Sequence, residues 1–167
     1  MSRADLLDFN VPLALAHVHY PHHTAARRYW EASTGSIAFC RTSMQGFLRL
    51  VSQPAVMGAA IQTLAEAWSI YTAHRATGRS VLLPEPENVD SVWQRLSSAD
   101  SFYIRDWKDS YLASFALCAD CRLVSFDAGF SRNRPSESGK EFGKTKGKLK
   151  SLSTLLNFLH LCPALVA

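Results

Sequence analysis

Three aspartates, Asp8, Asp109 and Asp127, stand where an apolar run ends or where a helix is expected to begin. In an open α/β sheet, residues just past the carboxyl ends of neighbouring strands converge on one crevice, so carboxylates that are far apart in the sequence can meet in space. Packed carboxylates repel one another and must take up protons unless a hard cation such as Mg²⁺ or Mn²⁺ neutralises them. These aspartates therefore predict a divalent-metal site for a hydrolytic reaction.

The elements that must position these aspartates alternate between short apolar strands and helices. Strands are expected at residues 6–8, 36–40, 81–83 and 123–126, and helices at 13–16, 24–32, 59–76, 89–96 and 109–118. A further helix carries Phe47, Leu48 and Leu50, is capped by Thr42 or Ser43, and stops at Pro54. In the helix at 59–76, the buried stripe should be Ile61, Leu64, Trp68 and Tyr71. This alternation predicts an α/β fold with a mostly parallel sheet and helices on both faces.

Four segments together resemble the PIN-domain ribonucleases, and among these the VapC toxins of bacterial toxin–antitoxin pairs. They are Leu-Leu-Asp-x-Asn-Val at 6–11, Gly-Phe-Leu-Arg-Leu at 46–50 with Pro54 after it, Asp-x-Tyr-Leu-Ala at 109–113 and Leu-Val-Ser-Phe-Asp at 123–127. The resemblance implies a three-layer α/β/α sandwich and a metal-dependent endoribonuclease that hydrolyses RNA. It also implies a small antitoxin as partner and a homodimer.

The resemblance assigns roles to five polar residues. Asp8 and Asp127 would bind Mg²⁺ or Mn²⁺ directly or through water, and Asp109 would hold a second ion or orient the nucleophile. Asn10 and Ser125 match small polar positions that hydrogen-bond the carboxylates or the phosphate. The metal would lower the pKa of its water and stabilise charge on the phosphoryl oxygens. Taken singly, Asp109 could instead cap a helix and Asp127 could be a turn residue, but their joint occurrence favours the site.

Met44 departs from the family pattern, which has its second acid, a glutamate, at this position. Glu66 from the next helix, or Asp106 if its helix starts early, could replace the missing carboxylate. Both are expected to be solvated surface acids instead. Two hypotheses therefore remain open: a working but weakened nuclease, and a PIN fold that has lost efficient catalysis and serves as a binding module for RNA or the antitoxin.

Basic residues offer two possible contacts with RNA. Arg49 could meet a phosphate or pair with Asp8. Residues 131–150 hold seven lysines and arginines against two glutamates, so the formal net charge of +4 belongs to this segment. Residues 131–152 are expected to form a basic flexible insertion before a final edge strand at 155–161, and either bind phosphates without sequence choice or only solubilise the protein. The candidate phosphate-binding residues are Arg132, Arg134, Lys144, Lys146 and Lys148.

Composition sets the remaining expectations. A chain of 167 residues with 47% hydrophobic residues is expected to form one PIN-like domain over residues 1–167. No apolar run approaches the ~20 residues of a membrane span, so a cytoplasmic protein without a membrane partner is expected. The cysteines at 40, 118, 121 and 162 should be reduced and mostly buried, with a redox pair at 118 and 121 as a remote alternative. The histidines at 17, 19, 22 and 23 are interpreted as a surface segment or RNA contact rather than a zinc site.

Overall fold

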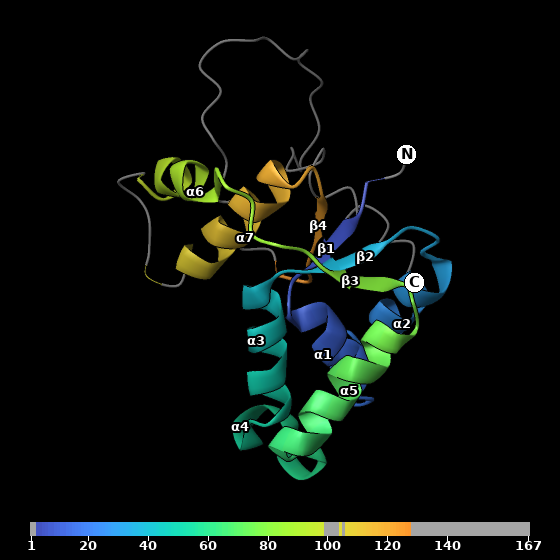
Figure 1. Ribbon diagram of the computed structural model, residues 1–167. Coiled ribbons are helices and arrows are strands. Elements are labelled where there is room, and N and C mark those ends of the chain that lie inside the picture. The colour runs from blue at the N-terminus through green and yellow to red at the C-terminus, as the bar shows by residue number, and fades with distance from the viewer. Residues whose placement is uncertain (1–2, 99–103, 105, 128–167) are drawn as a thin grey trace, which may run out of the picture.

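The computed structural model describes residues 3–98, 104 and 106–127, and these residues build a four-stranded parallel sheet (Figure 1). The strands are β1 (Asp5–Leu7), β2 (Ile37–Phe39), β3 (Ser80–Leu82) and β4 (Arg122–Val124). Their order across the sheet is β3-β2-β1-β4, and each neighbouring pair is parallel. β1 and β4 are therefore adjacent although more than half of the chain separates them.

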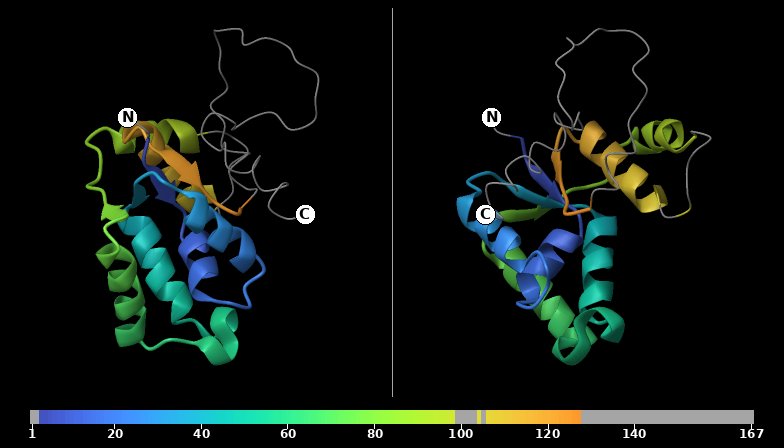
Figure 2. Two further views of the ribbon diagram at one scale, coloured as in Figure 1. Left: turned by 90° about the vertical axis from the view of Figure 1, so that its right-hand side faces the viewer. Right: turned by 180° about the vertical axis from the view of Figure 1, so that it is seen from behind.

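Helices cover both faces of this sheet, as Figures 1 and 2 show. One face carries α1 (Asn10–Ala16), α2 (His23–Ala32), α3 (Arg41–Val51) and α5 (Leu64–Ala76), with α4 (Pro54–Met57) and the 3-10 turn η1 (Gly58–Ala60) between α3 and α5. The other face carries α6 (Val89–Ser97) and α7 (Asp106–Cys118). This arrangement confirms the predicted three-layer α/β/α sandwich.

The apolar residues of β1, β2 and β4 are buried because helices cover both faces of the sheet there, whereas Val81 of the edge strand β3 is exposed. Successive side chains of a strand point to opposite faces. Leu7 and Val124 therefore pack into the core beneath α1, α3 and α5, whereas Leu6 and Leu123 pack against α6 and α7. The two cores fix β1 and β4 from both sides, so the chain that leaves their carboxyl ends starts from a rigid base.

The prediction of one helix over 59–76 is wrong. Pro54 does not only follow α3: it occupies the first turn of α4, where its missing N–H costs nothing. The chain then turns through η1, and α5 begins only at Leu64. Thr63 is the N-cap, its N–H donating to Glu66 Oε2 over 2.8 Å while Glu66 N–H donates to the Thr63 hydroxyl over 3.2 Å.

The predicted buried stripe of this helix is also wrong, except for Tyr71. Ile61 lies before the helix and is 41% exposed, while Leu64 and Trp68 are 74% and 51% exposed. Ala67 and Tyr71 make the buried contact instead. Leu64 and Trp68, which are at helical spacing, therefore form a face of α5 that the other described residues leave exposed.

The start of α3 differs slightly from the expected cap. Cys40, rather than Thr42 or Ser43, is the N-cap, and its sulfur accepts the Ser43 N–H over 3.4 Å. The Ser43 hydroxyl in turn accepts the Cys40 N–H over 3.1 Å. The helix ends at Val51, three residues before Pro54.

The described cysteines match the prediction of reduced and mostly buried thiols. Cys40 and Cys121 are buried, Cys118 is partly exposed, and all three are free. Burial raises the pKa of Cys118 and Cys121, which is the opposite of what a redox pair needs. Cys162 lies outside the described residues.

Two further expectations concern other parts of the chain. The basic insertion at 131–152, with its candidate RNA-binding residues, and the edge strand at 155–161 lie outside the described residues. Within the described residues, every helix is too short or too polar to cross a bilayer.

Candidate active site

The predicted site residues meet at the carboxyl ends of β1 and β4. Asp8 directly follows β1, and its N–H donates to Val124 O across the two strands over 2.9 Å. Ser125 and Asp127 follow β4, while Asp109 lies in the first turn of α7. The neighbouring parallel strands β1 and β4, together with helix α7, thus bring together residues from both halves of the chain.

Asp8 is fully buried and held by hydrogen bonds to both carboxylate oxygens. Its Oδ1 accepts the Phe9 N–H over 2.8 Å, and its Oδ2 accepts Asn10 Nδ2 and the Ser125 hydroxyl, each over 2.8 Å. Asn10 Nδ2 also donates to Ser125 Oγ over 2.9 Å, and Asn10 Oδ1 accepts the Phe126 N–H over 3.2 Å. Asn10 and Ser125 therefore fix the orientation of Asp8 and tie the two strand ends together.

Asp109 lies close enough to Asp8 and to Asp127 to interact electrostatically with each of them. Asp109 is buried, and Asp127 is exposed with its N–H donating to Ser125 Oγ over 3.0 Å. Burial raises the pKa of Asp109, and the charge of Asp127 raises it further. The exposed position of Asp127 gives this cluster of carboxylates a side that faces solvent.

Lys108 belongs to this cluster, and the sequence interpretation did not include it. Its Nζ lies 2.9 Å from Asp109 Oδ1 and 3.5 Å from Asp8 Oδ1, and it sits 4.2 Å from the centre of the Phe9 ring. In the sequence, a lysine beside Asp109 in a first helical turn looks like a surface residue. The signal that could have found it is its adjacency to an acid already assigned to a crowded anionic site.

The charges of this cluster shift one another's pKa values. Burial raises the pKa of Asp8, although Lys108 and the Ser125 hydrogen bond oppose this. Burial alone would lower the pKa of Lys108, but the charges of Asp8, Asp109 and Asp127 outweigh it, so the pKa is raised. Among the described residues, the three carboxylates of Asp8, Asp109 and Asp127 thus act on the one ammonium group of Lys108.

The donor chemistry of the cluster suits a hard divalent cation, which prefers carboxylate oxygens. Asp109 Oδ1 is buried without a hydrogen bond, although it makes the 2.9 Å ion pair with Lys108. As arranged here, no group of three or more His, Cys, Asp or Glu side chains within the described residues is close enough to hold a metal ion. The charge and the oxygen donors of these residues fit a divalent metal ion. In this structure the Lys108 ammonium lies beside the carboxylate oxygens that would bind the metal.

Met44, which stands where the family has its second acid, and the two candidate replacements, Glu66 and Asp106, differ in burial and position. Met44 is buried in the core beneath α1 and α3, and Arg41 lies 3.6 Å from its sulfur. Glu66 is exposed and caps α5, as expected for a surface acid. The expectation that Asp106 is a solvated acid is wrong, because α7 begins at Asp106 and this residue is only 5% exposed. Its charge raises the pKa of Asp109, so it lies near the cluster.

Arg49 lies on the exposed side of α3. The described ion pair of Asp8 is made by Lys108 instead, from the opposite layer of the sandwich. The ion pairs of the described residues include none between Arg49 and Asp8, and the phosphate contact of Arg49 stays a prediction.

Comparison with known proteins identifies the family. The chain is 36% identical over 133 residues to Ribonuclease VapC41 of Mycobacterium tuberculosis, which covers 76% of this chain and 91% of that protein. The chain belongs to the VapC ribonuclease family. Ribonuclease VapC38 of the same organism is 33% identical over 125 residues, covering 74% of this chain and 85% of that VapC. No family model matches the sequence.

Solved VapC structures share the fold. The Mycobacterium tuberculosis VapC20, a toxin that cleaves the sarcin–ricin loop, aligns with a TM-score of 0.59 at 15% identity over 77% of this chain and 93% of that chain. VapBC2 from Rickettsia felis, bound to a promoter DNA fragment, aligns with a TM-score of 0.56 at 14% identity over 77% of this chain and 92% of that chain. Because these sequence identities are only 15% and 14%, the structural similarity shows the fold alone, and this chain has the PIN-like VapC fold.

Proposed function

We propose that this VapC family member is a Mg²⁺- or Mn²⁺-dependent endoribonuclease that hydrolyses RNA phosphodiester bonds as the toxin of a toxin–antitoxin pair. The observation that carries the proposal is the buried Asp8, oriented by Asn10 and Ser125, beside Asp109 at the joined ends of β1 and β4. Its relatives VapC41 and VapC38 are ribonucleases, which gives the reaction class. Nothing in the described residues favours the alternative of a catalytically weakened binding module.

The chain's own residues suggest how the site would work. Asp8, Asp109 and Asp127 would hold the metal, which when bound supplies an activated water and neutralises charge on the phosphoryl oxygens. Asn10 and Ser125 keep Asp8 in one orientation, so its oxygens need no rearrangement. Lys108 lies beside these oxygens and can donate to a phosphate of the RNA strand.

The proposed partners follow from the family. VapBC2 of Rickettsia felis and VapBC-1 of nontypeable Haemophilus influenzae are complexes, the latter aligning with a TM-score of 0.51 at 13% identity over 78% of this chain and 91% of that chain. We infer that an antitoxin binds this chain and that the toxin is a homodimer acting on RNA in the cytoplasm. Sedimentation of the purified chain at several concentrations tests the dimer, which a concentration-independent monomer would contradict.

RNA cleavage tests the function. Purified protein should cut a mixed single-stranded RNA in Mg²⁺ or Mn²⁺ and leave it intact in a chelator. Asp8→Asn should abolish cleavage, because the buried carboxylate is the best-fixed oxygen donor of the site. Asp90→Asn, at an exposed acid of α6, is the matched control and should cut normally. Equal cleavage by wild type and Asp8→Asn would exclude the assignment.

A further inference from the structure

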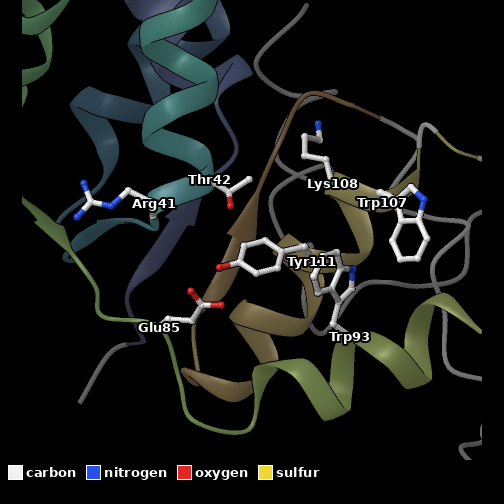
Figure 3. Close-up of a pocket in the computed structure, with 7 residues that line it drawn as sticks. All are labelled: Arg41, Thr42, Glu85, Trp93, Trp107, Lys108 and Tyr111. Carbon is white, nitrogen blue, oxygen red and sulfur yellow. The ribbon is translucent and has the colours of Figure 1, made fainter.

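A pocket lies beside the carboxylate cluster. It is a cavity of about 320 Å³, within the size range of small-molecule pockets, between the start of α3, the chain after β3, and helices α6 and α7 (Figure 3). Its lining includes Thr42, Glu85, Trp93, Trp107, Lys108 and Tyr111. Lys108 also contacts Asp8 and Asp109, so this pocket opens next to the proposed cleavage centre.

Three aromatic rings form one wall of the pocket. The Trp93 ring packs edge-to-face against Trp107 at 5.7 Å and against Tyr111 at 5.2 Å between centroids. Trp93 is fixed by its Nε1–H, which donates to the Ser110 hydroxyl over 2.9 Å. Trp107 is 52% exposed, so its ring has a free surface beside a fixed support. Proteins that bind single-stranded RNA stack bases on such rings.

Glu85 supplies the polar contact of the pocket. In Figure 3 the Tyr111 hydroxyl points toward the Glu85 carboxylate and toward Thr42, and burial together with the charge of Glu85 raises the pKa of Tyr111. An ionised carboxylate only accepts hydrogen bonds, and its two oxygens match a ligand edge with two adjacent donors. Among the RNA bases, guanine presents such an edge through its N1–H and its 2-amino group. Adenine, cytosine and uracil each present a single donor group on the corresponding edge.

We propose that this pocket binds two neighbouring bases of the RNA substrate, a guanine whose Watson–Crick edge lies on Glu85 and a second base stacked on Trp107, and that the guanine contact selects the site of cleavage. The proposal rests on the proposed ribonuclease function. From a base in this pocket, the strand runs past Lys108 toward Asp8. Glu85 and Trp107 are thus specificity-determining residues outside the carboxylate cluster.

Binding of labelled RNA tetranucleotides to the full chain in chelator tests the pocket without cleavage. The probes are uridine oligomers with guanosine, inosine or adenosine at the third position, followed by fluorescence anisotropy. Inosine keeps N1–H and lacks the 2-amino group. Wild type should prefer the guanosine probe by about 5-fold or more, as expected for a two-point base contact. Glu85→Gln should bring this ratio close to one.

Matched variants separate stacking from edge recognition. Trp107→Ala should weaken all three probes by about tenfold while keeping the guanosine preference, because stacking is tolerant of base identity. Glu87→Gln and Trp68→Ala, at an exposed glutamate near Glu85 and a tryptophan on α5, should bind as wild type does. An unchanged preference in Glu85→Gln, or no preference in wild type, overturns the proposal.

Two further measurements separate the pocket from the nuclease. If the protein prefers guanosine but cuts no RNA in Mn²⁺, the guanine pocket is supported and the proposed ribonuclease function is rejected. If the protein cuts RNA without a guanosine preference, only the guanine pocket is rejected. Weaker Mn²⁺ binding by Glu85→Gln would place Glu85 among the metal ligands and would also overturn the proposal.

Discussion

The two ends of β1 each carry a buried aspartate, and their surroundings differ. At the amino end, Asp5 receives two hydrogen bonds from the Arg122 guanidinium and one from the Tyr29 hydroxyl, the last over 2.8 Å. At the carboxyl end, Asp8 shares Lys108 with Asp109. The Asp5 site pairs one carboxylate with one guanidinium, whereas the Asp8 site gathers carboxylates around one ammonium.

This difference separates a structural ion pair from the proposed metal site. The hydrogen bond to Asp5 raises the pKa of Arg122, so the charged form of the guanidinium is favoured at this site. Burial instead raises the pKa of Asp8 and of Asp109, so their charged forms are disfavoured in the metal-free protein. A divalent cation would relieve the Asp8 site and has no role at the Asp5 site.

The largest expected effect is on the Asp5 pair. Arg122→Met should lower the free energy of unfolding by about 2–4 kcal/mol, because it leaves a buried carboxylate without its cation while Arg122 itself is partly exposed. Urea unfolding measures the loss, and Asp5→Asn with Arg122→Met gives the coupling. A loss below about 1 kcal/mol would place this pair with ordinary surface ion pairs.

At the Asp8 site, removal of the internal cation should favour metal. Lys108→Met should tighten Mn²⁺ binding on the order of tenfold or more, because an ammonium within about 4 Å repels an incoming cation by several kcal/mol at an effective dielectric constant near 20. Calorimetry of wild type, Lys108→Met and the exposed control Arg95→Met compares the affinities. Weaker Mn²⁺ binding by Lys108→Met would show that the lysine helps to hold the bound state rather than competing with the ion.

The smallest effect is the pH dependence of the metal-free protein. The folded-state pKa values of Asp8 and Asp109 are raised, so their contribution to stability is present below their unfolded pKa and is lost as the pH rises through the folded values. Lys108 lowers both pKa values, so its removal should cost about 1 kcal/mol more at pH 7 than at pH 4. Urea unfolding in chelator at both pH values measures this. An equal cost at the two values would contradict the proposed charge coupling.

The sequence predicted the frame of the site because apolar runs mark where strands end. Leu6-Leu7 and Leu123-Val124 are buried on both faces, so the residues that follow them had to converge. The positions of Asp8, Asn10 and Ser125 relative to one another follow from that convergence. The ligand role of Asp8 and the supporting roles of Asn10 and Ser125 remain predictions.

Packing decided what the sequence could not. Leu64 and Trp68 have helical spacing, but spacing does not state which face another element covers, and both side chains are exposed. Asp106 and Lys108 have the composition of a solvated helix start, yet Asp106 is buried near Asp109, and Lys108 pairs with Asp8 and Asp109. The charged residues of α7 are buried or partly buried because they interact with other charged residues of the cluster. These interactions include tertiary contacts, which the local sequence does not reveal.

The most direct test of the central claim is a Mn²⁺ titration of the full chain, followed by the loss of the free-ion signal in electron paramagnetic resonance. Wild type should bind Mn²⁺, and Asp8→Asn should lose that binding while keeping the circular dichroism spectrum of the fold. Asp90→Asn should bind as wild type does. Equal Mn²⁺ affinity in wild type and Asp8→Asn would contradict the assignment of the carboxylate cluster as the metal centre.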